Sequence, residues 1–263
     1  MTQSQALEIL KLGHNVYLTG GAGSGKTYLL NEYINYLKNN GAAVGVTAST
    51  GIAATHISGI TIHSWSGLGI KDNLSPKDLQ DLTKKHYLKK RFKHARVLVI
   101  DEISMLHGYQ LDLISQICRY FKNNSRPFGG LQVVLCGDFF QLPPIGRGAT
   151  FAISADVWGQ MDLKICYLHE QYRQDDDRLT YILDSIRSNE VNEDVVDCLN
   201  ERCQSSITQS DNFVAKLFTH NIDVDTLNHQ TLEKISGLTR LYQMRGSGKK
   251  KLIQTLGSGC LAP

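Results

Sequence analysis

The feature that constrains this chain most is the glycine-rich segment GGAGSGKT at residues 20–27. It follows a short β-rich run, NVYLT at residues 15–19, and precedes apolar residues at helical spacing, namely Leu29, Leu30, Tyr33, Ile34 and Leu37. Glycine allows the positive φ angles that turn successive backbone N–H groups inward, and the helix directs its positive dipole end at the same point. The order strand, anion cradle and helix is the context that predicts a P-loop.

Each position of this segment has a predicted role in holding a nucleoside triphosphate and its metal ion. Lys26 would reach the β- and γ-phosphates, and the Thr27 hydroxyl would ligate Mg²⁺. The alternative is a glycine-rich turn that binds nothing, but the flanking strand and helix favour the phosphate site. The cradle itself would be formed by Gly20, Gly21, Ala22, Gly23, Ser24 and Gly25.

Further apolar runs have the length of strands, and segments with helical spacing separate most of them. These runs lie at residues 44–47, 97–100, 131–136 and 163–168. Strands that alternate with helical crossovers predict an α/β fold with a mainly parallel sheet and helices on both faces. We assign residues 1–175 to this domain and place a small insertion at about residues 68–96.

The pattern changes after about residue 175. Apolar stripes at helical spacing over residues 176–205 predict a helical linker region. An apolar run at residues 214–219 and a helical pattern at residues 224–232 predict that a second α/β unit begins within residues 206–263.

Two carboxylates follow the apolar run at residues 97–100 directly. Asp101 and Glu102 would therefore lie at the carboxyl edge of the sheet, where open α/β sheets hold their ligands. Behind a P-loop, Asp101 is expected to bind the Mg²⁺ shell, and Glu102 to orient and deprotonate the attacking water. A solvated acidic turn is the alternative for this pair.

Polar side chains also follow the last two predicted strands of the first domain. Gln141 stands in the segment CGDFFQLPP, beyond the third of the further strands, and is a candidate sensor of the γ-phosphate. Arg173 stands in LHEQYRQ after the fourth, where a guanidinium could stabilise charge on the transferring phosphoryl group. The alternatives are an ordinary loop amide for Gln141, and for Arg173 an ion pair with the acids at residues 175–177.

The composition describes a globular protein, with 41% hydrophobic and 20% charged residues. No apolar run approaches the roughly 18 residues of a membrane span, and no signal peptide is recognisable, so we expect a cytoplasmic protein without a membrane partner. The six cysteines form no CxxC pair and are interpreted as reduced core thiols. Residues 84–96 hold seven Lys or Arg and no acid, which indicates either an attraction for nucleic acid or a solvated helical face.

Taken in order, these motifs and several others resemble the petite-integration-frequency (PIF) family of superfamily-one DNA helicases. The resemblance covers nearly the whole chain, and residues 105–119 are similar to the family's signature segment. The matching segments are GGAGSGKT, TASTGIAA, TIHSWSG, VIDEISML, PFGG, CGDFFQLPP, LHEQYRQ and, at the start of a second motor domain, LFTHNIDVDTLN.

The resemblance implies a RecA-like ATPase domain that uses ATP with Mg²⁺ and moves 5′ to 3′ along single-stranded DNA. It also implies work on tailed duplexes in DNA repair, recombination, or replication and telomere-type maintenance. Gln3 takes the place of the family's adenine-reading glutamine, with Gln5 as the fallback. The residues implied as strand contacts are Thr50, Thr61, His63, Ser64 and Trp65.

The physical chemistry of these side chains agrees with a role on a nucleic acid strand. Hydroxyls and an imidazole suit phosphate contacts, and an aromatic ring such as that of Trp65 can stack on a base. For His63 and Trp65 the alternative is packing of a loop against the domain, and for Trp65 both interpretations stay open. The basic residues 84–96 are a second, less specific candidate for contact with the strand.

The chain departs from the family pattern at its end, because the family continues beyond the equivalent of residue 263. The missing part would include an arginine that completes the ATP site. We therefore expect a monomer that binds Mg-ATP, turns over slowly and does not unwind DNA by itself. Two alternatives remain: a recombination-type motor subunit of a nuclease complex, and a truncated protein that binds nucleotide or DNA without catalysis.

Overall fold

A computed structural model describes residues 1–146, 148–170, 172, 176–204, 217–219, 221–237 and 240. The chain divides into two compact units, Met1–Leu199 and Asn200–Pro263. The predicted strand at residues 214–219 lies mostly outside the described residues, and residues 217–219 are not in a strand. In the second unit one helix is described, α11 (Asn221–Glu233).

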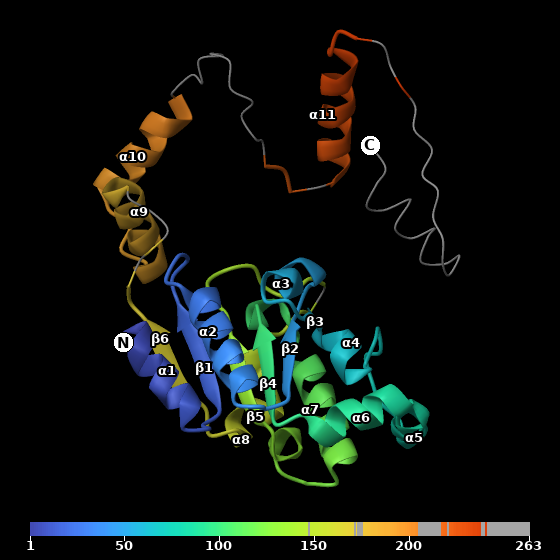
Figure 1. Cartoon of the computed structure of the whole chain (residues 1–263). Helices are drawn as coiled ribbons and strands as arrows, with labels where there is room; N and C mark the ends of the chain where they lie inside the picture. Colours follow the sequence, from blue (N-terminus) through green and yellow to red (C-terminus); the bar gives the residue numbers. More distant parts are fainter. Residues whose placement is uncertain are drawn as a thin grey trace. The chain divides into compact units, whose positions relative to one another are not determined.

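The first unit is built on one parallel sheet, which confirms the predicted α/β class (Figure 1). The strand order is β3-β2-β4-β5-β1-β6, and every neighbouring pair runs parallel. The five longer strands agree with the predicted runs to within one residue at each end. Their bounds are β1 (Val16–Gly20), β2 (Val44–Ala48), β3 (Ile60–Thr61), β4 (Val97–Asp101), β5 (Gln132–Cys136) and β6 (Lys164–Leu168).

Helices cover both faces of this sheet, because successive strand residues point to opposite sides. On one face Val16 and Leu18 pack against three helices, and on the other Tyr17 packs against a second group. The helices of the first face are α1 (Gln3–Lys11), α2 (Lys26–Asn39) and α3 (Gly51–His56). Those of the second are α4 (Ile62–Ser66), α5 (Pro76–Lys84), α6 (His86–His94), α7 (Gly108–Lys122) and α8 (Asp156–Gln160).

Local signals set the ends of several helices. α1 begins at a capping box in which the Thr2 and Gln5 side chains bond to each other's backbone N–H groups.

Three short 3₁₀ turns also lie in the loops, η1 (Ile103–Met105), η2 (Pro127–Gly130) and η3 (Ala152–Ser154). The basic stretch 84–96 consists mainly of α6, whose Leu88 and Phe92 are buried, so this helix is amphipathic.

Two helices follow the sheet, α9 (Asp177–Ser188) and α10 (Glu193–Gln204). They fall in the segment where a helical linker is predicted, and its role as a linker stays a prediction. Five cysteines lie among the described residues, and all five are free thiols, of which Cys118, Cys136 and Cys166 are buried. None of the helices that the structure describes combines the length and the apolar character that a membrane crossing requires.

Candidate nucleotide site

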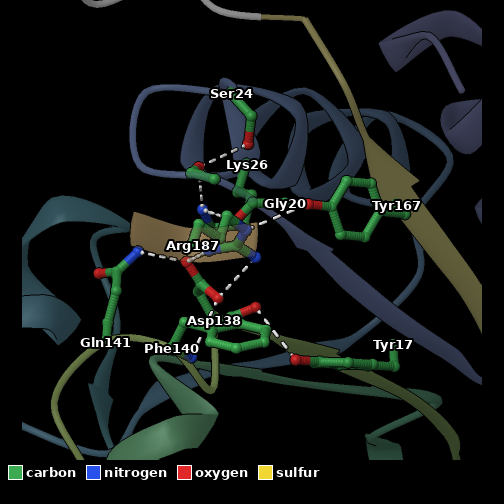
Figure 2. A network of polar contacts seen from close by, with 11 residues as sticks. Tyr17, Gly20, Ser24, Lys26, Asp138, Phe140, Gln141, Tyr167 and Arg187 are labelled. Carbon is green, nitrogen blue, oxygen red and sulfur yellow. Dashed lines mark hydrogen bonds and ion pairs between the residues drawn. The ribbon is translucent and has the colours of Figure 1, made fainter. Parts of the chain in front are cut away.

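The glycine-rich loop connects β1 to α2 at the carboxyl edge of the sheet, as predicted. Gly25 has φ of 80°, a left-handed conformation that favours glycine, and a Cβ at this position would displace the Gln3 amide from beside the loop. The Lys26 ammonium donates to the carbonyl oxygens of Gly20 at 3.0 Å and Gly21 at 2.9 Å (Figure 2). The Ser24 hydroxyl also donates to the Gly21 carbonyl at 3.0 Å. Hydrogen bonds from two of its own side chains therefore stabilise the conformation of the loop.

A cavity of about 460 Å³ opens against this loop and brings three of the predicted catalytic residues together. Its volume lies in the range of ordinary small-molecule sites. Lys26 at the start of α2, Glu102 after β4 and Gln141 after β5 all line it. The remaining lining residues are Ala22, Gly23, Gly25, Thr27, Tyr28 and Tyr172.

Two side chains from outside the loop pack against it. The Gln3 amide nitrogen donates to the Ser24 carbonyl at 3.4 Å, whereas the Gln5 side chain accepts from the Thr2 N–H in the α1 cap. The structure thus places Gln3, and not the fallback Gln5, beside the phosphate cradle. Tyr172 was not predicted: its N–H donates to the Gly23 carbonyl at 3.0 Å, and its ring lies beside Gly25. Its position next to Arg173 in LHEQYRQ was the only signal for it in the sequence.

The acidic pair lies at the end of β4, and Glu102 lines the same cavity. Asp101 is buried, and one of its carboxylate oxygens accepts from the Glu102 N–H at 2.9 Å. Burial raises the pKa of both carboxyl groups above the ordinary value. The positive charge of the nearby Lys26 ammonium opposes this increase but does not cancel it. For Glu102 the charge of Asp101 is a further reason for the increase.

The backbone of Glu102 is strained, with φ of 52° and ψ of 47° in the left-handed region. A non-glycine residue in this conformation costs about 1–2 kcal/mol. The Ser49 hydroxyl donates to the Glu102 carbonyl at 2.8 Å and so helps to hold this conformation. Strain of this kind is characteristic of functional sites, and here it directs a carboxylate into the cavity.

Gln141 forms two hydrogen bonds with Asp138, whose side-chain carboxylate is buried. Its side-chain amide donates to Asp138 at 3.1 Å, and its backbone N–H donates to the Asp138 carbonyl at 3.0 Å. Arg187, which sequence reasoning missed, forms an ion pair with the same Asp138 (Figure 2). Arg173 lies outside the described residues, so its role stays a prediction.

The hydroxyl residues implied as strand contacts lie at the starts of short helices. Thr50 accepts from the Ala53 N–H at 3.2 Å, and Thr61 accepts from the exposed Ser64 N–H at 3.3 Å. Each threonine hydroxyl still has its proton to donate to a phosphate. His63 is half-buried, burial lowers the pKa of its imidazole, and Gln110 of α7 forms a hydrogen bond with it.

The structure corrects the assignment of Trp65 as a strand contact. The side chain is only 4% exposed and packs edge-on against Phe92, with ring centroids 4.9 Å apart. A Cβ on Gly45 would lie 2.6 Å from its ring, which shows how closely β2 covers it. Because a base needs an open aromatic face, this burial supports the packing interpretation that was left open.

A parallel sheet with this loop after β1, carboxylates after β4 and a glutamine after β5 defines a P-loop NTPase with the RecA-like α/β fold. The chain belongs to the PIF1-like helicase family, whose model matches residues 3–201.

Individual relatives agree with this assignment. The chain is 48% identical to the ATP-dependent DNA helicase Pif1 of a Psychrobacter species over 97% of its own length, and 32% identical to PIF1 of Saccharomyces cerevisiae over 99%. It spans 40% and 31% of these two relatives, respectively.

Solved structures show the same fold. The crystal structure of Pif1 helicase from Candida albicans gives a TM-score of 0.86 at 32% identity, covering 99% of this chain and 61% of that one. Pif1 from Bacteroides in complex with ADP-AlF3 and ssDNA gives a TM-score of 0.76 at 31% identity, covering 90% and 58% of the respective chains. The predicted family and the RecA-like fold are therefore confirmed.

Proposed function

We propose that this chain is the nucleotide-binding front part of an ATP-dependent DNA helicase that moves 5′ to 3′ along single-stranded DNA. The observation that carries the proposal is that Lys26, Glu102 and Gln141 line the same cavity. A binding loop, a general base and a phosphate sensor are the parts that a motor ATPase needs at one point. A glycine-rich turn without a ligand would not need a strained glutamate or a sensor beside it.

ATP fits the residues that line the cavity. The Lys26 ammonium can exchange the Gly20 and Gly21 carbonyls for phosphate oxygens, and Gln3 and Tyr172 offer an amide and an aromatic ring for the base. Thr27 and Asp101 provide the oxygen ligands that Mg²⁺ prefers. When bound there, Mg²⁺ would neutralise charge on the phosphates.

Residues of this chain would supply every part of the hydrolysis machinery except the part that a second domain contributes. The Glu102 carboxylate would orient the attacking water and accept its proton, and a raised pKa makes it a better base at neutral pH. Gln141 would contact the γ-phosphate and register its loss. Arg173 would add positive charge to the phosphoryl group in transfer.

We propose that the DNA strand lies across Thr50, Thr61, His63 and Ser64. Hydroxyls at the starts of two helices and a neutral imidazole can form hydrogen bonds with phosphate oxygens. Such contacts do not depend on the base sequence of the DNA. The related Bacteroides Pif1 forms a complex with ssDNA, which supports this type of ligand. The basic helix α6 adds long-range attraction for the same polyanion.

In the whole protein, residues 1–175 would be the first motor domain, residues 176–205 a linker, and residues 206–263 the start of a second motor domain. We place the protein in the cytoplasm with the DNA on which it acts, in repair, recombination or telomere-type maintenance. A monomer that engages tailed duplex DNA is the proposed working form.

Phosphate release by residues 1–263, measured with and without single-stranded DNA, tests the function. Lys26→Ala should weaken ATP binding strongly, because it removes the side-chain cation at the cradle, whereas Glu102→Gln should bind ATP and not hydrolyse it. Wild-type behaviour of both variants in titration and in turnover would show that the site is wrongly assigned. DNA-stimulated release would argue against a protein that only binds nucleotide, and unwinding by a longer chain would argue against a nuclease-complex subunit.

A further inference from the structure

Arg187, in the last turn of α9, forms a two-point ion pair with the buried Asp138. Its two terminal nitrogens donate to the two carboxylate oxygens at 2.7 Å and 3.0 Å. The Asp138 side chain is 1% exposed and that of Arg187 is 19% exposed. Paired charge-assisted bonds fix orientation as well as distance, so the guanidinium holds the carboxylate in one plane.

Contacts on the other sides restrict the guanidinium to one position. It lies 4.7 Å from the centre of the Phe140 ring and 5.9 Å from that of Tyr167, and its Nε donates to the Tyr167 hydroxyl at 3.2 Å. In Figure 2 the guanidinium lies between Tyr167 and Asp138, with the Phe140 ring nearby. Arg187 thereby contacts β6 and the loop that follows β5 at once.

The same carboxylate orients the glutamine that lines the nucleotide cavity. The Asp138 oxygen that accepts from Arg187 at 2.7 Å also accepts from the Gln141 amide at 3.1 Å, and the other oxygen accepts from the Phe140 N–H at 3.2 Å. Burial alone would raise the pKa of Asp138, but the hydrogen bonds from Arg187 and Gln141 bring it below its usual value. Without Arg187, a buried carboxylate would keep only neutral donors and would have to turn or take up a proton.

We infer that Arg187 is a positioning residue for γ-phosphate recognition, acting through Asp138 on Gln141. The inference rests on the proposed role of Gln141 as the phosphate sensor. It also ties α9, the first helix after the last strand of the sheet, to the state of the nucleotide site. A structural ion pair without this role would affect folding stability and leave nucleotide preference unchanged.

The test is the ratio of two dissociation constants for residues 1–263, one for ADP and one for a non-hydrolysable ATP analogue with an intact γ-phosphate. Gln141→Ala should lose preference for the analogue by about tenfold, the size of one hydrogen bond to a charged group. Arg187→Gln should lose a comparable part of it, with ADP affinity kept, because the P-loop holds the other phosphates. In a Gln141→Ala background, Arg187→Gln should have no further effect on the ratio.

Controls separate positioning from folding. Arg126→Gln removes an exposed guanidinium ahead of the amino end of β5, far from the carboxyl edge, and should leave the ratio unchanged. Arg187→Lys keeps the charge but not the two-point geometry and should restore the ratio only in part, which also covers the case that Arg187→Gln does not fold. Melting temperatures are recorded for every variant.

The outcomes distinguish the inference from the proposed function. If Gln141→Ala leaves the ratio unchanged, the sensor role of Gln141 fails and the inference fails with it. If Gln141→Ala lowers the ratio but both Arg187 variants keep the wild-type value, the inference alone is overturned and Arg187 is a structural ion pair. An additive loss in the double variant would also overturn it, since Arg187 would then act independently of Gln141.

Discussion

Replacing Trp65 with alanine tests whether this ring serves the core or the DNA strand. The ring is 4% exposed, lies under β2 at Gly45 and meets Phe92 at an interplanar angle of 67°. Removing a buried tryptophan of this kind costs about 3–5 kcal/mol, because the lost contacts and the cavity both count. The edge-on aromatic pair accounts for roughly 0.5–1.5 kcal/mol of this. A domain stabilised by about 5–15 kcal/mol would lose a large fraction of its stability.

Urea unfolding of residues 1–263 measures this loss, and DNA binding is then compared at a temperature where both proteins are folded. Tyr87→Ala is the matched control, because Tyr87 is 55% exposed and lines the same surface pocket as Trp65. It should change stability by no more than about 0.5 kcal/mol. A Trp65→Ala variant that is as stable as wild type and has lost its affinity for single-stranded DNA would refute the packing interpretation.

Other residues of the site give predictions of their own. Tyr172→Ala should weaken ADP and ATP binding by similar factors, as measured by titration, since the ring lies beside Gly25 of the loop that would hold the phosphates common to both nucleotides. His63→Ala should reduce affinity for single-stranded DNA in fluorescence anisotropy at low salt and leave ATP binding intact. The pKa of Glu102 lies above its ordinary value of 4.5, and only the carboxylate accepts a proton, so turnover should fall as pH falls through this raised pKa. A pH–rate profile with no acid limb would contradict this role of Glu102.

The sheet and the cavity could be predicted because their signals are local in the sequence. Each buried strand is an apolar run, and carboxyl ends of parallel strands meet at one edge whatever the order of the strands. Residues that follow such runs, like Glu102, were therefore expected beside the P-loop, and the structure places Glu102 in the same cavity as Lys26. The prediction needed only the parallel direction of the strands, not the order in which they lie.

Trp65 and Arg187 could not be placed because their partners are remote in the chain. A tryptophan in TIHSWSG is equally compatible with an exposed face and with a buried one, and the deciding neighbour is Gly45 on β2. Arg187 is one of several charged residues on an amphipathic helix, and its partner Asp138 lies 49 residues earlier. Only the folded chain shows that this arginine is the counter-ion of a buried acid.

Both unfavourable features of the catalytic edge are offset by residues that are not among the predicted nucleotide contacts. The left-handed Glu102 costs about 1–2 kcal/mol, and a hydrogen bond from Ser49 of the β2 loop holds it. The buried charge of Asp138 would cost several kcal/mol if unpaired, and Arg187 of α9 neutralises it. Motifs thus specify which groups meet the nucleotide, whereas contacts from β2 and α9 determine whether those groups keep the geometry that chemistry requires. Under the proposed sensor role of Gln141, loss of the γ-phosphate would change the hydrogen bond of Gln141 to Asp138, and with it the contact of Asp138 with Arg187 in α9. A difference of this kind between two nucleotide states is what any coupling of the site to α9 requires.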